Sequence, residues 1–367
     1  MAEAAAPTLP FRAEHIGSLL RPRALTSAFR AHREGAMTDE ALAAVLDDSI
    51  REAVALQEAV GLRSITDGEF RRGSWFLGFV DAVEGLTVKE SLFAFGGDHA
   101  QWSCPSCEGK VRRTRGITTE EFKFLQGVTR NTPKITMPSP TAMHFWRGKD
   151  TVDAKVYPDI EVFFADLATV YQQELRALAE LGATYVQLDE VPIAMLCDDK
   201  VRDKLRAHGV DPDALLRRYV KLINQALAGR PAGMTVGMHL CRGNYKGQWM
   251  AEGGYDPVAD MLFNGIDVDI FFLEYDSPRA GDFAPLRHVP KSKSVVLGLI
   301  STKVPETPGA DELKRRIDEA AKIMPLERLA LSPQCGFASS VGGNPVTLDD
   351  QKRKLARVVE VADAVWH

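Results

Sequence analysis

The feature that most constrains the fold is a regular alternation of short apolar runs with longer stretches of helical periodicity. Apolar residues at helical spacing predict helices over residues 40–62, 161–181, 212–227, 255–263, 310–323 and 348–365. Short β-prone runs predict strands at residues 64–66, 134–137, 184–188, 234–238, 268–273, 294–297 and 329–331, with a further candidate strand at 15–17. Strands that alternate with helices favour parallel pairing, and eight such units favour an α/β fold closed as a single TIM-like (β/α)8 barrel.

Residues 74–116 interrupt this alternation. They show no helical periodicity and mix aromatic, glycine and basic residues, which predicts an inserted β-hairpin arm. The alternative fold is an open, doubly wound sheet with a loop insertion, but the Gly-x-Gly-x-x-Gly fingerprint of dinucleotide-binding sheets does not follow the first strand. We therefore interpret residues 1–367 as one barrel domain with an insertion at about residues 74–116.

Composition excludes several classes of protein. A formal net charge of −5, 45% apolar residues and 26% charged residues are ordinary for a globular protein and indicate no basic surface for nucleic acid. No run approaches the roughly 18 apolar residues that span a bilayer, and residues 1–10 lack the pattern of a signal peptide. We expect a cytoplasmic protein with no nucleic-acid or membrane partner, in which the five cysteines are free thiols or metal thiolates.

Polar side chains cluster at or just after the carboxyl ends of the predicted strands. Those ends converge on one face of a barrel, where barrel enzymes keep their catalytic groups. Each residue alone would be explained as a capping acid or a hydrogen-bonded histidine, whereas together they predict a site. The residues are His15, Asp67, Glu69, Asp189, Glu190, His239, Cys241, Glu274 and Cys335.

The sharpest group among them is His239-x-Cys241 with Glu274 and Cys335. Two thiolates and an imidazole form a soft donor set that suits zinc in tetrahedral geometry. A His-x-Cys pair taken alone is more often a hydrogen-bonded histidine next to a small core residue, so the pair needs support from its context.

That context is a family resemblance. The chain resembles the cobalamin-independent methionine synthase family in the order and approximate spacing of its motifs from residue 15 to about residue 340. The full-length synthases have two barrels, and this chain resembles the C-terminal catalytic one. The matching motifs are Ile-Gly-Ser at 16–18, Asp-Gly-Glu-x-x-Arg at 67–72, Leu-Asp-Glu at 188–190, His-Leu-Cys at 239–241, Phe-Leu-Glu at 272–274 and Ser-Pro-Gln-Cys-Gly at 332–336.

The resemblance implies a TIM-like barrel that binds Zn2+ and activates a thiol, homocysteine in the synthases, for attack on a methyl group. It implies that the zinc ligands are His239, Cys241, Glu274 and Cys335. Glu69 and Asp189 match the family's homocysteine-binding acids and are our candidates for catalytic and substrate-binding acids, and the backbone of Ile16, Gly17 and Ser18 matches the family's Ile-Gly-Ser. Four protein ligands leave no open position, so we expect Glu274 to loosen when a substrate sulfur binds.

Two departures from the family lie where the substrates are expected. The synthases have an Asp-x-His before a Ser-Pro, and this histidine is their proposed proton shuttle; residues 298–305 contain no histidine. Lys303, Ser301 or Thr302 are candidates for different acid or anion-binding work. The family's Asp-Glu-Pro-Ala-Leu is Asp-Glu-Val-Pro-Ile here, at 189–193. Both departures leave the methyl donor and the thiol acceptor open.

Three further features have two readings each. His15 with Arg21 is either a binding pair for a substrate anion or a capping histidine beside a surface arginine. Cys104-Pro-Ser-Cys107 is more simply a turn than half a metal site or a redox pair. Trp75 and Trp102 are either the core of the arm or the flank of a flat ligand such as a pterin, and we favour the core.

We favour a zinc-dependent enzyme that transfers a methyl group to a thiol, with homocysteine as acceptor and methionine as product. The methyl donor would be a folate, methylcobalamin or a small methylated compound. One alternative is a zinc alkyltransferase that uses a coenzyme M-like thiol with an epoxide or a corrinoid-bound methyl. The other is a non-catalytic barrel that binds zinc or thiols.

Overall fold

Six parallel strands form the main sheet of the protein. The computed structural model describes residues 9–93 and 102–366. Along the sheet the strands follow in chain order, each hydrogen-bonded to the next. They are β5 (Ile135–Pro138), β6 (Tyr185–Glu190), β7 (Thr235–Leu240), β8 (Ile270–Glu274), β9 (Ser294–Ile300) and β10 (Leu329–Pro333).

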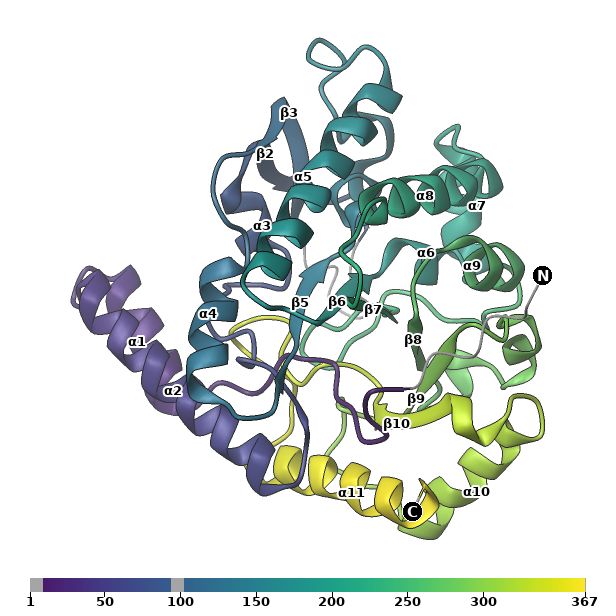
Figure 1. Cartoon of the computed structure of the whole chain (residues 1–367). Coiled ribbons are helices and arrows are strands. Elements are labelled where there is room, and N and C mark those ends of the chain that lie inside the picture. The colour runs from purple at the N-terminus through teal and green to yellow at the C-terminus, as the bar shows by residue number, and fades with distance from the viewer. Residues whose placement is uncertain (1–8, 94–101, 367) are drawn as a thin grey trace.

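Two further strand positions continue the ring. β1 (Ser64–Ile65) pairs in parallel with β4 (Thr132–Pro133), and the chain of β4 runs through Lys134 into β5. On the other side of the sheet, Ala13 forms a parallel bridge to Leu331 of β10. Within the described residues the seam between Ala13 and β1 is held by side chains, since Ser64 Oγ donates to Glu14 Oε2 at 2.7 Å. The expected α/β fold of the TIM-like type is therefore confirmed, although among the described residues the hydrogen-bonded ladders do not close into a complete ring (Figure 1).

Helices surround the strands, and the predicted ones agree with the structure to within a few residues (Figure 1). The helix over 212–227 begins where the sequence signals it: Pro212 is the first helical residue and the Asp211 side chain accepts from Asp213 N. The outer helices that were predicted are α2 (Asp39–Ala59), α5 (Ile160–Glu180), α8 (Pro212–Leu227), α9 (Ala259–Gly265), α10 (Ala310–Ala321) and α11 (Leu348–Trp366), and α4 (Thr119–Val128) is an outer helix that was not predicted.

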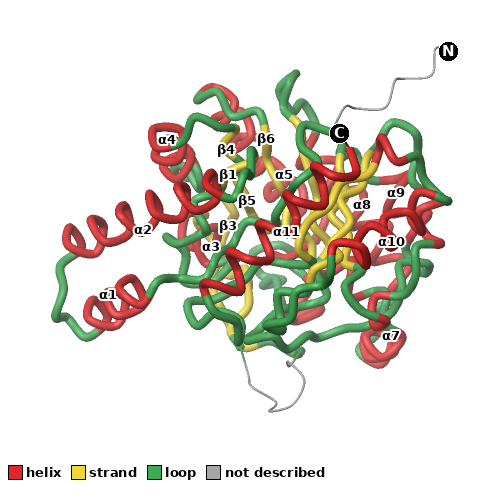
Figure 2. The backbone as a smooth tube through the Cα atoms, turned by 90° about the horizontal axis from the view of Figure 1, so that it is seen from below, coloured by secondary structure: helices red, strands yellow, loops and turns green. Residues whose placement is uncertain are grey.

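Short elements fill the loops, and the sequence analysis did not predict them. α1 (Arg23–Arg33) packs on α2, and the two helices extend together from one side of the barrel (Figure 2). The others are α6 (Pro192–Met195), α7 (Asp199–Ala207) and the 3-10 helices η1 (Pro140–Met143), η2 (Phe145–Asp150), η3 (Pro278–Ala280), η4 (Ala284–His288) and η5 (Leu326–Arg328). None of the helices within the described ranges has the length and apolar character that crossing a membrane requires.

The inserted arm is a β-hairpin, as predicted. β2 (Val83–Glu90) pairs antiparallel with β3 (Ser103–Arg113). Two details of the prediction are wrong, because a short helix, α3 (Leu77–Ala82), precedes the hairpin, and Cys104 and Cys107 lie within β3 rather than in a turn. Both thiols are buried, and within the described residues neither belongs to a group that could hold a metal ion.

The inside of the barrel is filled by one face of each strand. Side chains alternate between the two faces of a strand, so residues two apart share a face. On β6 the buried Tyr185 lies inside, and on β8 Phe272 does, both in the cluster that fills the barrel interior. Gly237 of β7 makes room for this cluster, because a Cβ atom there would lie 2.6 Å from Cε2 of Phe272.

This contact predicts a stability effect. We expect Gly237→Ala to lower the free energy of unfolding by about 1–3 kcal/mol, because overpacking a filled core forces neighbouring side chains out of place. Urea denaturation followed by circular dichroism would measure the change. The matched control is Gly127→Ala in α4, where a Cβ meets nothing within 4 Å and where alanine should be neutral or stabilising by up to about 1 kcal/mol. Equal effects of the two substitutions would contradict the packing argument.

Candidate active site

A cavity opens at the carboxyl ends of the strands. One part of its wall carries His239, Cys241 and Cys335 together with the acids Glu69 and Asp189. The rest is largely apolar and includes three tryptophans. The remaining lining residues are Ile16, Ser18, Trp75, Trp102, Trp146, Val191, Gly243, Asn244, Met250, Gly336 and Ser339.

Four side chains of this region form a compact donor group. One ligand atom from each of His239, Cys241, Glu274 and Cys335 lies within 4.8 Å of all the others, and all four residues are buried. The two sulfurs are 3.5 Å apart. Two thiolates bound to a tetrahedral zinc at ~2.3 Å would be about 3.8 Å apart, so the spacing fits this metal. Within the described residues neither ring nitrogen of His239 has a hydrogen-bond partner, which leaves the imidazole available as a ligand.

The strand pleat explains how these residues meet. His239 follows Gly237 by two positions on β7, and Glu274 follows Phe272 by two positions on β8, so both point into the barrel at its carboxyl end. Cys241 comes directly after β7, and Cys335 comes two residues after β10. The predicted convergence of strand ends therefore brings the four residues together.

Basic side chains surround the carboxylate of Glu274. Arg242 Nη1 lies 3.5 Å and Arg279 Nη1 3.6 Å from its Oε2, and Gln334 Nε2 donates to its Oε1. Burial alone would raise the pKa of Glu274, but Lys303 and the two arginines hold it below its usual value. Glu274 is therefore ionised at neutral pH, as a metal ligand must be.

Lys303 acts on this carboxylate through an amide. Its Nζ donates to Gln334 Oε1 at 2.7 Å, and Gln334 in turn donates to Glu274. The backbone N–H of Lys303 donates to Ser301 Oγ at 3.4 Å, while the carbonyl of Thr302 accepts from Asn344 Nδ2 at 3.0 Å. Among the three residues considered in place of the family's histidine, only Lys303 is linked by these bonds to the donor group.

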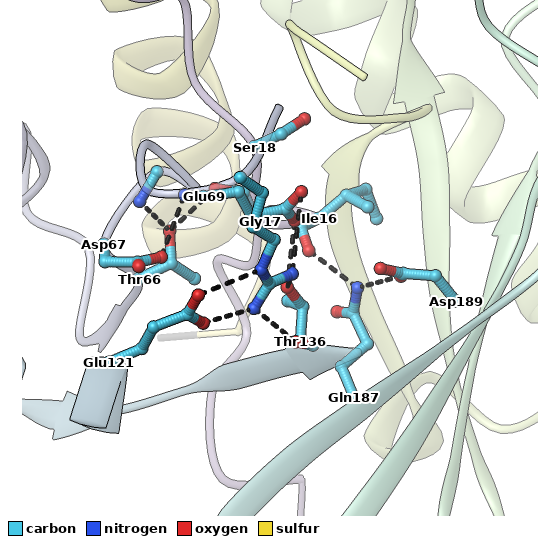
Figure 3. Close-up of polar contacts among 12 residues, drawn as sticks. Ile16, Gly17, Ser18, Thr66, Asp67, Glu69, Glu121, Thr136, Gln187 and Asp189 are labelled. Atoms are coloured by element: carbon cyan, nitrogen blue, oxygen red, sulfur yellow. Dashed lines mark hydrogen bonds and ion pairs between the residues drawn. The ribbon is translucent and has the colours of Figure 1, made fainter. Parts of the chain in front are cut away.

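Glu69 is held in an uncommon backbone conformation. Its φ is +60°, which side chains with a Cβ adopt rarely and mostly at functional sites. Its N–H donates to Asp67 Oδ1 at 2.8 Å, and its carbonyl accepts from Arg21 Nη2 at 2.8 Å. The carboxylate is oriented by Thr136, whose Oγ1 donates to Oε1 at 2.9 Å (Figure 3). These bonds aim Glu69 into the cavity.

Asp189 lies on the inner face of β6 and shares the cavity wall with Glu69. Gln187, two residues earlier on that face, donates from Nε2 to Asp189 Oδ1 at 2.8 Å and to the carbonyl of Ile16 at 2.6 Å (Figure 3). Burial, followed by repulsion from Glu69, raises the pKa of Asp189 to about 7. Burial also raises the pKa of Glu69. Two buried acids on one wall therefore favour a cationic ligand group between them.

The segment Ile16–Gly17–Ser18 borders these acids. Ile16 and Ser18 line the cavity, while Gly17 has φ +141° and a Cβ there would meet Thr136 Cγ2 at 2.7 Å and Glu69 Oε1 at 2.9 Å. Thr66 Oγ1 donates to the carbonyl of Gly17 at 2.7 Å. Only glycine fits at this close approach.

Other residues predicted at strand ends do not reach the cavity. Glu190 points to the opposite face from Asp189, where it accepts from Thr141 Oγ1 at 2.5 Å and from Ile193 N at 2.7 Å. His15 is buried away from the cavity lining, and burial and the charge of Lys134 hold its pKa well below its usual value. The Asp67 side chain accepts a hydrogen bond from the backbone N–H of Glu69 and so stabilises the turn that carries Glu69.

The proposed anion site of His15 and Arg21 is not supported. The guanidinium of Arg21 donates hydrogen bonds to three backbone carbonyls, those of Glu69, Arg72 and Ser340. A neutral imidazole and an arginine already bonded in this way do not form a binding pair for an anion. Arg21 instead braces the loop that carries Glu69.

Sequence reasoning missed several residues of the site. Gln187 was detectable, because it lies two residues before Asp189 on the same strand face. Trp146 gave no signal, since it reaches the cavity from η2, and there it stands edge-on to Trp102 at 4.8 Å between ring centroids. The tryptophans predicted as arm core thus also line the cavity.

Comparison with known proteins agrees with this geometry. The model of the cobalamin-independent synthase catalytic domain matches residues 11–363. The chain belongs to this family. It is therefore a methyltransferase of the cobalamin-independent methionine synthase type.

Individual relatives cover nearly the whole chain. The uncharacterized protein YxjH of Bacillus subtilis is 39% identical over 361 residues, which is 97% of this chain and 95% of YxjH. A methionine synthase of Pyrococcus abyssi is 28% identical over 328 residues, 88% of this chain and 85% of that protein. A structure from Listeria monocytogenes, provisionally named a vitamin-B12-independent methionine synthase, superposes with a TM-score of 0.78 at 36% identity over 99% of both chains.

The donor group predicts metal binding. We expect Cys335→Ser to lose most bound zinc, because a hydroxyl does not replace a thiolate as a soft ligand. Atomic emission or a chromophoric chelator would measure the zinc content of purified protein. Cys197→Ser is the matched control, since Cys197 is also buried but lies outside the group, and it should keep the metal. Full zinc occupancy in Cys335→Ser would show that Cys335 is no ligand.

Proposed function

We propose that the chain transfers a methyl group to the thiol of homocysteine on a zinc ion held by His239, Cys241, Glu274 and Cys335. The observation that carries the proposal is the shared cavity: a soft metal-binding group and two buried acids line the same wall. Homocysteine has the two groups that match them, a thiol for the metal and an ammonium for the acids.

The metal half of the site would activate the acceptor. Bound zinc keeps a substrate thiol as thiolate at neutral pH, where a free alkyl thiol with a pKa of about 8.5 is mostly protonated. The chain's own part is to hold three anionic ligands, Cys241, Cys335 and Glu274, so that the bound sulfur stays electron-rich. The arginines beside Glu274 offer its carboxylate other partners, which supports the expectation that this ligand loosens.

The acid half would select the acceptor. An ammonium group placed between Glu69 and Asp189 relieves their mutual repulsion and ionises Asp189, so binding of the amine is favoured over binding of a neutral or anionic group. This argues against a coenzyme M-like thiol, whose sulfonate would approach two carboxylates. For the methyl donor, the prediction remains a folate, methylcobalamin or a small methylated compound. The donor would lie next to the tryptophans of the cavity wall.

A direct test measures methionine formation. Zinc-loaded protein would be incubated with homocysteine and each donor class, and methionine would be quantified by mass spectrometry. We expect product with homocysteine and none with 2-mercaptoethanesulfonate. X-ray absorption spectroscopy should also show that the zinc gains a sulfur neighbour when homocysteine is added. Tight zinc binding with neither product nor added sulfur would favour the non-catalytic barrel.

The pKa of Asp189 predicts a pH dependence. Asp189 is ionised above about pH 7 and protonated below it, so its attraction for an ammonium weakens as the pH falls. We expect the preference for homocysteine over 4-mercaptobutanoate, which lacks the amine, to drop about tenfold from pH 8 to pH 6. Dissociation constants measured by calorimetry would give this ratio. Both ligands carry a thiol, so the effect of thiol ionisation cancels in the ratio. Asp189→Asn should show a smaller ratio that varies less with pH, because Glu69 remains as the second acid, and an unchanged wild-type ratio would refute the assignment.

A further inference from the structure

Behind Glu69 lies a second buried acid that touches neither the cavity nor the metal group. Glu121 belongs to the first turn of α4 and is not among the cavity-lining residues. Its carboxylate binds Arg72, with Oε2 2.7 Å from Nη2 and Oε1 3.4 Å from Nε (Figure 3). The side chains of Arg72 and Glu121 are 4% and 11% exposed, so the pair is strongly coupled.

Arg72 connects this pair to Glu69. Its Nη2 donates to the carbonyl of Thr136 at 2.7 Å and its Nη1 to Thr136 Oγ1 at 3.0 Å. The same hydroxyl donates to Glu69 Oε1 at 2.9 Å. Glu121, Arg72, Thr136 and Glu69 therefore form one continuous chain of hydrogen bonds from the outer helix to the cavity.

The distances show that Arg72 is paired more closely with Glu121 than with Glu69. Its nearest approach to Glu69 is 3.8 Å, between Nη1 and Oε2, whereas its contact with Glu121 is a direct bond. Without Glu121, the buried guanidinium would keep its two bonds to Thr136 but would have Glu69 as its nearest carboxylate, and a direct ion pair would occupy Glu69. With Glu121 in place, the guanidinium is bonded to a carboxylate outside the cavity, and the carboxylate of Glu69 is left without a direct ion pair and open to a ligand cation.

We propose that Glu121 is a positioning residue for substrate recognition: through Arg72 and Thr136 it holds Glu69 open to the ammonium group of the acceptor. The inference rests on the proposed function, because it takes Glu69 as an acid that binds the amine. It adds a residue 49 positions away from Arg72 in sequence, on the outside of the barrel.

Glu121→Gln tests this role with little change in shape. Zinc-loaded wild type and variant would be titrated with homocysteine and with 4-mercaptobutanoate, and the ratio of the two dissociation constants would be compared. We expect the variant to lose about five- to tenfold of the preference for homocysteine and to bind 4-mercaptobutanoate unchanged. In turnover, KM for homocysteine should rise while kcat changes less than about twofold.

The design separates positioning from folding. Both thiols are measured on the same sample, so a partly unfolded variant gives the same ratio as a folded one. Glu120→Gln is the matched control, because this neighbour in α4 is exposed and bonds only Lys123 at 2.6 Å among the described residues; it should match wild type. Glu121→Asp keeps the negative charge, so it should retain more of the preference for homocysteine than Glu121→Gln does.

Each outcome decides the proposal. If Glu69→Gln loses the preference for homocysteine but Glu121→Gln keeps it, the positioning role is wrong and the proposed function stands. If the wild type shows no preference for the amine, the role of Glu69 fails and the inference fails with it. A double variant, Glu69→Gln with Glu121→Gln, should be no worse than Glu69→Gln alone, since both substitutions act on one interaction.

Discussion

The alternation of side chains along the barrel strands is the constraint on which the site depends. The face of β6 that buries Tyr185 in the barrel presents Asp189 at its carboxyl end, and the face of β8 that buries Phe272 presents Glu274. A shift of one residue in either strand would exchange core and site residues together. Packing of the barrel interior thus fixes the geometry of the chemistry above it.

Charge balance is the second requirement, because every titratable group of the candidate site is buried. The two halves of the cavity meet it differently. Glu274 has two arginines at 3.5 and 3.6 Å and stays ionised, as a metal ligand requires. Asp189 has no arginine or lysine within ion-pair distance in the part of the chain that the structure describes, so burial and Glu69 bring its pKa to about 7. The candidate metal-binding group therefore has its charge balanced by the protein, whereas in the proposed function Glu69 and Asp189 would be balanced by the ammonium group of the substrate.

Much of the fold was predictable, for identifiable reasons. The helix at 212–227 was located to the residue because Pro212 and Asp211 mark its start and its apolar stripe is regular. The missed helices carry weak signals: α7 has few apolar residues, and α3 spans only six residues within a segment of aromatic and basic residues. The six strands of the main sheet were placed correctly but end later than predicted, because polar residues such as Glu190 still pair in the sheet. The candidate strand at 15–17 is wrong, since within the described residues the chain there pairs with β10 only through a bridge at Ala13.

The sequence by itself determined the candidate metal-binding group: the motifs of the family resemblance named His239, Cys241, Glu274 and Cys335, and the strand–helix alternation placed them at one end of a barrel. Tertiary structure decided which polar residues share a face. It turned Asp189 inward and Glu190 outward, and it buried His15 away from the cavity. It also joined Arg72 to Glu121 across 49 residues. Such contacts depend on how segments that are far apart in the sequence pair and pack, and local sequence patterns do not indicate which of these segments come together.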